Sequence, residues 1–335
     1  MQVPFVYGPN DLRLCEVERP RAGSRDVVLR VAATGVCGSD LGFVAMGGPG
    51  APTGKPMPIG HELSGTVIEA GSEVSTFAVG DRVILNPLVN LVGNGGPEGG
   101  FAEQLLVRDV ADRPGSLLRL PDSVPLEVGA IVEPLAVGVH AVKRLGARPG
   151  DKVAVFGAGP IGSAALVALR HAGVEDVVVF DLSAFRRERA LRLGARSAID
   201  PRETPAAEAL AALHGEVPVL SGKGPGTTHF LEASGAPIIA DIVDFARSGA
   251  TLCVTSLQKK PVAVDFIRVM SRELTLTGSL GYPTELPEAI AIVESGQVDV
   301  DAFVSHRFDG ANFMQAFETA GQPDRAAKVL VRYED

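Results

Sequence analysis

VAVFGAGPIGSAALVALRHAGVEDVVVFD, residues Val153–Asp181, is the stretch of the chain that decides its fold. Residues 153–156 are apolar and lead into a glycine-rich turn, an apolar helical run follows, and a second apolar strand ends on Asp181. The order strand, glycine turn, helix, strand and acid is the arrangement of a dinucleotide-binding unit. We therefore predict a bound dinucleotide; the alternative is a glycine-rich turn in an α/β domain that binds nothing.

Each glycine of the turn has its own physical task. Gly157 allows the tight turn, Gly159 lets the backbone approach a pyrophosphate, and Gly162 lets helix and strand pack closely. The helix begins with Pro160 and Ile161, and its N-terminus presents free N–H groups and the positive end of the helix dipole. This turn is therefore predicted to hold the phosphates of the cofactor.

The chain as a whole has the composition of a globular protein, with 335 residues, 46% hydrophobic and 21% charged. Its length suggests two domains or one large one. A net charge of −9 without a basic block argues against nucleic-acid binding. No apolar run approaches the roughly 20 residues of a membrane span, no signal peptide is evident, and three scattered cysteines form no disulfide framework. We expect a soluble cytoplasmic protein.

The pattern of the chain changes along its length. Residues 1–125 read as short strands broken by glycine and proline, which is typical of a β-barrel or sandwich. Leu126–Ala147 reads as a helical stretch in which Pro134 either causes a kink or lies in a first turn. From Lys152 onward strands alternate with helices, which predicts a doubly wound parallel sheet. Gly215–Gly226 resembles a loop and is not placed by its pattern.

Two glycine-cornered turns in the first region carry residue types that bind metals. Val36–Asp40 contains Cys37, Pro58–Glu62 contains His61, and thiolate and imidazole are the usual ligands of Zn²⁺. A lone Cys can equally be a small buried apolar residue, and a lone His can be structural. Glu133 is a third candidate, because a carboxylate in an apolar run must be paired, bound to metal or exposed at a helix end.

Five motifs follow one another as in a known family: GVCGSD, GHE, GDRV, EPLAV and GAGPIG. With them the chain resembles, over essentially its full length, the medium-chain zinc-dependent dehydrogenases, the superfamily of alcohol, sorbitol, butanediol and threonine dehydrogenases. The resemblance implies an α/β fold in three parts. These are a GroES-like β-barrel catalytic domain (1–137), a Rossmann domain with a doubly wound parallel sheet (138–277) and a C-terminal segment returning to the catalytic domain (278–335), with the active site in the cleft between the domains.

The resemblance also implies a catalytic zinc site. Cys37 and His61 match two ligands, Glu133 matches the third protein ligand, and Glu62 matches the acid beside the metal. Since a thiolate and one carboxylate already neutralise Zn²⁺, we expect Glu62 and Glu133 to alternate as ligands. Asp40 matches the acid that orients the ligand histidine, the alternative being a solvated turn acid.

In such a site zinc lowers the pKa of the bound alcohol, while Ser39 would take the hydroxyl proton and pass it outward through the cofactor ribose. Many family members have a histidine three residues after this serine, where the chain has Gly42, so the end of the relay is left open. The segment that matches the structural-zinc lobe, Asn86–Gly100, contains no cysteine. We therefore expect one catalytic zinc and no structural zinc.

Asp181 decides the predicted cofactor. A carboxylate at this strand end can accept hydrogen bonds from both adenosine-ribose hydroxyls and would repel a 2′-phosphate, which favours NAD over NADP. Arg186 matches the basic residue that the family places five positions later. Ser256 and Leu280 match loop positions over the nicotinamide, and Lys328 matches a C-terminal basic residue near the pyrophosphate.

The remaining polar residues are given structural roles. Arg187, Arg189 and Arg192 are expected on a solvated helix face. Packed or core positions are expected for His140, His171, Cys15 and Cys253. The substrate pocket is expected to be lined by Leu41, Phe43, Tyr282 and parts of residues 87–100.

We predict a zinc-dependent, NAD-linked dehydrogenase that interconverts a secondary alcohol, polyol or sugar-like substrate and its ketone, as a homodimer or homotetramer. One alternative of the same fold is a zinc-free quinone or enoyl reductase. The other is a non-catalytic dinucleotide-binding protein.

Overall fold

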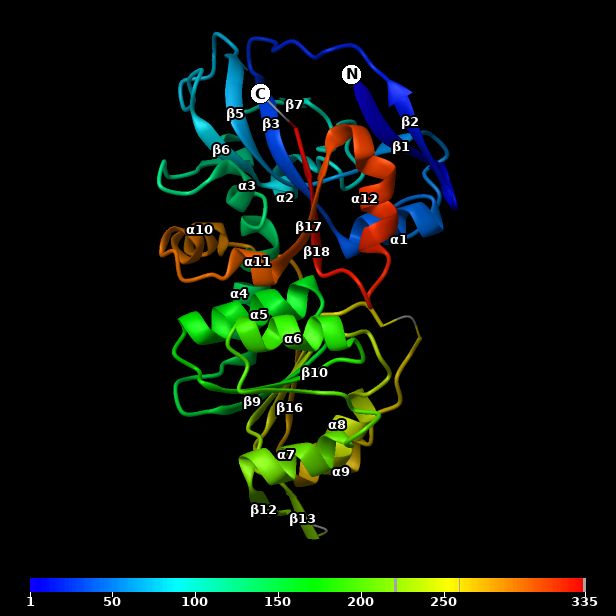
Figure 1. Cartoon of the computed structure of the whole chain (residues 1–335), viewed down its shortest axis with the longest axis vertical. Helices are drawn as coiled ribbons and strands as arrows, with labels where there is room; N and C mark the ends of the chain where they lie inside the picture. Colours follow the sequence, from blue (N-terminus) through cyan, green and yellow to red (C-terminus); the bar gives the residue numbers. More distant parts are fainter. Residues whose placement is uncertain (220–221, 259, 334–335) are drawn as a thin grey trace.

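A computed structural model describes residues 1–219, 222–258 and 260–333 and contains two sheet regions, one above the other in Figure 1. Both chain ends lie in the upper region, and the lower region holds the stretch 153–181. The α/β class is thereby confirmed, with a largely antiparallel sheet in the upper region and a parallel one in the lower region. No described helix is long and apolar enough to cross a bilayer.

The upper region is built around a long antiparallel pair, β3 (Val27–Val36) and β5 (Glu62–Ala70). Most residues of these strands are buried, and Val27, Leu29, Val31, Leu63 and Val67 pack into one apolar core. The sheet order is β17-β18-β3-β5-β6-β8, and β7 also pairs with β3. The other N-terminal strands are β1 (Gln2–Gly8), β2 (Asp11–Glu16), β4 (Met57–Pro58), β6 (Arg82–Leu85), β7 (Gln104–Val107) and β8 (Leu117–Arg119).

The end of the chain returns to this upper sheet. β17 (Val304–Asp309) pairs with β18 (Lys328–Arg332), and β18 lies antiparallel to β3 with Val329 opposite Val36. Between them, α12 (Phe313–Ala320) packs Phe313 against Phe101, with ring centroids 4.9 Å apart. Lys328 is thereby carried into the region where β3 ends.

The lower region is a six-stranded, fully parallel sheet in the order β11-β10-β9-β14-β15-β16. Helices cover it on both sides, with α4, α5 and α6 above it and α7, α8 and α9 below it in Figure 1. Its strands are β9 (Lys152–Phe156), β10 (Asp176–Phe180), β11 (Ser197–Ile199), β14 (His229–Glu232), β15 (Thr251–Val254) and β16 (Thr275–Gly278). Its helices include α5 (Pro160–His171), α6 (Ala184–Arg192), α7 (Ala206–His214), α8 (Ile239–Phe245) and α9 (Phe266–Ser271).

The two regions are joined by helices. The stretch expected to be helical divides into α3 (Leu126–Gly129) and α4 (Val132–Leu145), and Pro134 lies in the first turn of α4, where its missing N–H costs nothing. α4 runs through the expected boundary between residues 137 and 138. A side chain at Gly138 would come within 2.5 Å of the α5 backbone, so this glycine lets the two helices pack closely.

The segment Gly215–Gly226 is not a plain loop. It contains an antiparallel hairpin of β12 (Glu216–Val219) and β13 (Gly222–Pro225), although residues 220–221 lie outside the described residues. The remaining helices are α1 (Gly38–Met46), α2 (Pro87–Asn90), α10 (Leu286–Glu294) and α11 (Val300–Phe303).

Candidate active site

The metal-ligand candidates meet where β3 ends and β5 begins. Cys37 is the N-cap of α1, and His61 directly precedes β5, whose first residue is Glu62. Because Gly35 and Glu62 are partners across the two strands, these ends lie side by side. Ligand atoms of Cys37, His61 and Glu62 all lie within 4.8 Å of one another.

Two glycines make room for this cluster. A Cβ on Gly35 would lie 2.2 Å from Oε2 of Glu62, so any side chain there would displace the carboxylate. Gly60 has φ +95°, and a Cβ there would lie 2.5 Å from the ring of Phe101. Glycine is therefore required on both sides of the cluster.

Asp40 joins the turn that carries Cys37 to the turn that carries His61. Its carboxylate accepts hydrogen bonds from the backbone N–H of Cys37 at 2.9 Å and of Gly60 at 3.2 Å, and it is fully buried. Its Oδ1 lies 3.6 Å from Nδ1 of His61. Burial alone would lower the pKa of His61, but the charges of Asp40 and Cys37 outweigh burial and raise this pKa well above its ordinary value.

Lys328 lies in this cluster beside Glu62, and its place near the pyrophosphate stays a prediction. It is 1% exposed, and its Nζ contacts Oε2 of Glu62 at 2.5 Å and donates to the carbonyl of Val36 at 3.0 Å. The cause is the pairing of β18 with β3, which turns the ammonium toward Glu62. The signal in the sequence was a lone cation in an apolar strand, which requires a buried partner.

Glu133 faces the same cluster from the first turn of α4. It is 8% exposed, and burial raises its pKa to about 7, with His61, Glu62 and Lys328 among the charges that act on it. Tyr282 lies beside it, and the buried hydroxyl of Tyr282 has no hydrogen bond of ordinary geometry among the described residues. Glu133 is outside the group of three whose ligand atoms lie within 4.8 Å.

The cluster has the properties of a site for a divalent cation of borderline softness. It offers a thiol, an imidazole and a carboxylate, the donor set that suits Zn²⁺. Oε1 of Glu62 is buried without a hydrogen-bond partner among the described residues. Buried polar atoms without partners are costly, and a bound cation would relieve that cost.

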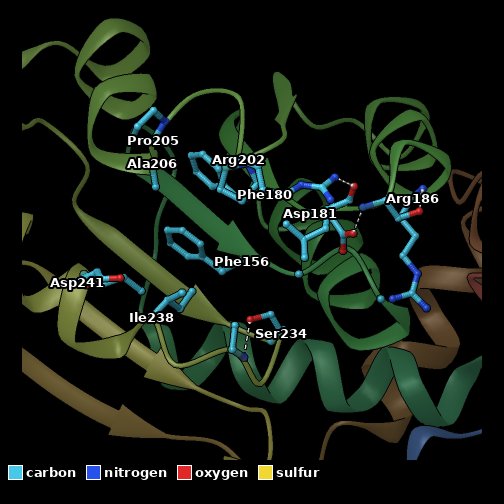
Figure 2. Close-up of a pocket in the computed structure, with 18 of the residues that line it drawn as sticks. Phe156, Phe180, Asp181, Arg186, Arg202, Pro205, Ala206, Ser234, Ile238 and Asp241 are labelled. Atoms are coloured by element: carbon cyan, nitrogen blue, oxygen red, sulfur yellow. Dashed lines mark hydrogen bonds between the residues drawn. The ribbon is translucent and has the colours of Figure 1, made fainter. Parts of the chain in front are cut away.

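The glycine turn borders a cavity of about 770 Å³ in the lower region (Figure 2). Its wall contains the stacked rings of Phe156 and Phe180, whose centroids are 4.9 Å apart, and Asp181 lies at one side of them. Gly157 has φ +96°, as the tight turn requires. Asp181 accepts hydrogen bonds from the backbone N–H of Ala158 at 2.7 Å and of Ser183 at 2.8 Å.

Arg186 lies at the turn itself. An ideal Cβ on Gly159 would be 3.5 Å from Nη1 of Arg186, and Nε of Arg186 donates to the carbonyl of Ala326 at 2.9 Å. Asp181 is close enough to act on its charge. Arg186 is therefore a cation that this structure places beside the glycine turn.

Of the three other arginines of α6, Arg192 is exposed, as predicted, whereas Arg187 and Arg189 are half-buried rather than on a solvated face. All three bind neighbouring segments. Arg187, Arg189 and Arg192 contact, in that order, the Asp200 carboxylate at 3.1 Å, the Asp301 carbonyl at 2.6 Å and the Asp299 carboxylate at 3.0 Å. The cause is that α6 packs against α11, so that two of these arginines reach the C-terminal segment.

Four further expectations concern packed residues. Cys253 is fully buried, whereas Cys15 is half-buried on β2, with its Sγ 3.4 Å from the hydroxyl of Tyr7. His140 is largely buried, with Nδ1 3.2 Å from Glu285. His171 is exposed at the end of α5, so its expected packing is wrong, as is the core position of Cys15.

The remaining predicted site residues lie around the two regions. Ser39 is half-buried in the first turn of α1, two residues from Cys37. The hydroxyl of Ser256 donates to the carboxylate of Glu232, and Leu280 is 87% exposed after β16.

Comparison with known proteins agrees with this geometry. Residues 23–122 match the alcohol dehydrogenase GroES-like domain, and residues 160–295 match the zinc-binding dehydrogenase family. Sorbitol dehydrogenase of Bos taurus is 35% identical over 98% of this chain and 94% of its own. The structure of 2R,3R-butanediol dehydrogenase from Bacillus subtilis is 28% identical with a TM-score of 0.85, covering 99% of both chains. The NADH complex of an alcohol dehydrogenase from Escherichia coli is 25% identical with a TM-score of 0.85, again covering 99% of both chains.

Proposed function

Since the chain belongs to the family of zinc-binding alcohol dehydrogenases, we propose that it interconverts a secondary alcohol, polyol or sugar-like substrate and its ketone with NAD as cofactor. The observation that carries this proposal is that one chain holds two sites. One is the zinc-type cluster of Cys37, His61 and Glu62, and the other is the cavity bordered by Gly157, Phe180 and Asp181, which we call the dinucleotide cradle. The substrate class is that of the sorbitol and butanediol dehydrogenases to which the chain is similar.

We assign the catalytic zinc to Cys37, His61 and Glu62, with Glu133 beside it. When bound, zinc supplies a Lewis acid that polarises the substrate oxygen and favours loss of its proton. Asp40 faces Nδ1 of His61, which leaves Nε2 as the ligand atom. Lys328 balances the charge of Glu62, so that the thiolate and carboxylates do not leave the site strongly negative. That the chain binds one catalytic zinc and no structural zinc stays a prediction.

Ser39 is proposed as the group that takes the hydroxyl proton of the substrate. It stands in the first turn of α1, directly after the Cys37 turn. Position 42 is glycine, and a Cβ there would meet only Met46 at 3.8 Å. The proton is therefore proposed to leave through the cofactor ribose and water.

The cofactor assignment rests on the cradle. Phe156 and Phe180 offer an apolar wall for adenine, Asp181 offers acceptors for the ribose hydroxyls, and the N-terminus of α5 with Arg186 faces the pyrophosphate. The negative charge of Asp181 supports NAD over NADP. Ser256 and Leu280 remain proposed contacts of the nicotinamide half.

The expected three-part division and the oligomer are also proposals. Residues 1–137, 138–277 and 278–335 would form the catalytic domain, the Rossmann domain and the returning segment. β16 lies at the edge of the parallel sheet, and α9, the helix before it in the chain, carries Phe266, Ile267 and Met270, each at least 70% exposed. A strand at the edge of a sheet and exposed apolar side chains support pairing with a second copy of this chain. That this protein acts in the cytoplasm stays a prediction.

A substrate panel tests the proposed function. Zinc-loaded protein is assayed with NAD and with NADP on sorbitol, 2,3-butanediol, threonine and simple secondary alcohols, by the absorbance of reduced nicotinamide. We expect NAD reduction on at least one polyol or diol. A zinc-free quinone or enoyl reductase would instead reduce quinones or enones after zinc has been removed by a chelator. A non-catalytic protein would bind NADH but turn over none of these substrates.

A further inference from the structure

A fully buried carboxylate, Glu232, ends β14 in the middle of the parallel sheet. Its Oε1 accepts hydrogen bonds from the backbone N–H of Ser234 at 2.7 Å, from the backbone N–H of Gly235 at 2.8 Å and from the Ser234 hydroxyl at 2.5 Å. Its Oε2 accepts from Nε2 of Gln258 at 2.8 Å and from the hydroxyl of Ser256. One side chain thus joins the loop after β14 to the loop after β15.

These two loops adjoin the glycine turn. A Cβ on Gly157 would lie 2.9 Å from the backbone of Ser234, and Ser234 also lines the dinucleotide cavity (Figure 2). Gly235 approaches the second loop closely, because its ideal Cβ would be 3.3 Å from the carbonyl of Leu257. The side chain of Leu257 is 84% exposed.

The direction of the cofactor follows from the order of the strands. The adenosine half would occupy the cavity beside Asp181, on the β10 side of β9, and the pyrophosphate would lie at the turn after β9. To reach the cluster around Cys37, the other half must continue past the turn, along the carboxyl ends of β14 and β15. The nicotinamide would therefore pass the two loops that Glu232 joins.

Among the described residues, five groups donate to Glu232, and an ionised carboxylate is the side chain that only accepts. An unpaired carboxylate in this position would be strongly unfavourable, but five donors satisfy it. An apolar side chain of similar size, such as leucine, would accept from none of them, and the N–H groups of Ser234 and Gly235 would lose their acceptor.

We propose that Glu232 is a positioning residue for the nicotinamide half of the cofactor: it fixes the Ser234–Gly235 and Ser256–Gln258 loops as one surface against which that half binds. The proposal rests on the proposed function, since it requires a bound nicotinamide dinucleotide. It assigns no contact with the reacting atoms to Glu232 itself.

The test compares two ligands in zinc-loaded protein by titration calorimetry. NADH contains the nicotinamide ring and its ribose, whereas ADP ends at the pyrophosphate and lacks both. For Glu232→Leu we expect the affinity for NADH to fall roughly tenfold or more, because buried donors lose their acceptor. ADP should bind within about twofold of wild type, since adenosine and pyrophosphate bind before the two loops are reached.

Two variants separate positioning from a general loss of structure. Glu232→Gln keeps an acceptor oxygen for Ser234 and Gly235, and its amide N–H can donate to the hydroxyl oxygen of Ser256, so NADH affinity should stay within about threefold of wild type. Asp151→Asn removes a hydrogen-bonded carboxylate just before β9, at the amino end of the same sheet, and should change neither affinity.

If Glu232→Leu does not fold, Gln258→Ala takes its place. It removes one donor and leaves the carboxylate four others, and NADH affinity should fall about threefold with the affinity for ADP unchanged. Equal losses for both ligands, or an unchanged NADH affinity, would overturn the positioning role. Wild-type protein that binds neither ligand would instead contradict the proposed function.

Discussion

The metal cluster and the dinucleotide cradle hold charged groups in opposite ways. In the cluster, Asp40, His61, Glu62, Glu133 and Lys328 each expose 8% or less of their surface, and their charges face one another. In the cradle, most of the contact surface is backbone and apolar rings, and Asp181 is only half-buried. A substitution in the cluster should therefore alter folding stability as well as catalysis, whereas a substitution in the cradle should alter mainly which cofactor binds.

The largest expected effect is the loss of the ammonium of Lys328. Lys328→Met leaves Glu62 as a buried charge without its partner, which typically costs about 3–5 kcal/mol of folding free energy. Urea unfolding of the metal-free protein measures the change. The double variant Lys328→Met/Glu62→Gln removes both charges and should recover most of the loss. A loss below about 1 kcal/mol in the single variant would show that the pair is not a buried one.

The second effect is a pH dependence set by Glu133. Burial raises the pKa of Glu133 from 4.5 to about 7, so between these values the folded protein retains a proton that the unfolded chain has released. The free energy of unfolding of the metal-free protein should therefore fall as pH rises through this window, by at most about 3 kcal/mol from this group.

Glu133→Gln should flatten that slope, which urea unfolding at a series of pH values measures. Glu294→Gln is a matched control on an exposed helix end and should leave the slope as it is. If the slope is the same in wild type and in Glu133→Gln, the buried position of this carboxylate is not what makes stability depend on pH.

The smallest expected effect on stability is in the cradle. Asp181→Ala removes two acceptors of backbone N–H groups at a half-buried site, which should cost about 1 kcal/mol. Its effect on cofactor choice should be larger, a fall of about 10- to 100-fold in the ratio of kcat/KM for NAD to that for NADP. An unchanged ratio would show that Asp181 does not select the cofactor.

What could be predicted from the sequence was local or carried by a motif. The glycine turn, its strands and the acid at Asp181 form one continuous stretch, so their order fixes their arrangement. Cys37 and His61 are recognisable because each stands in a short motif with glycine beside it.

What could not be predicted depends on contacts between distant segments. The partner of Lys328 is 266 residues away, and only the pairing of β18 with β3 brings the two charges together. Arg187 and Arg189 were expected in solvent, because a helix pattern does not tell which neighbour covers the helix. Glu232 stands in none of the recognised sequence motifs, and its five donors come from two loops that meet only in the folded sheet.

The most direct test of the account is the zinc content of purified protein together with its NAD-linked activity, in wild type and in Cys37→Ser. We predict about one zinc per wild-type chain, and for Cys37→Ser less than half an equivalent with activity reduced at least about a thousandfold. Cys15→Ser, on a half-buried strand away from the cluster, should retain both. Wild-type protein with less than half an equivalent of zinc, or a Cys37→Ser variant that remains active, would contradict the account.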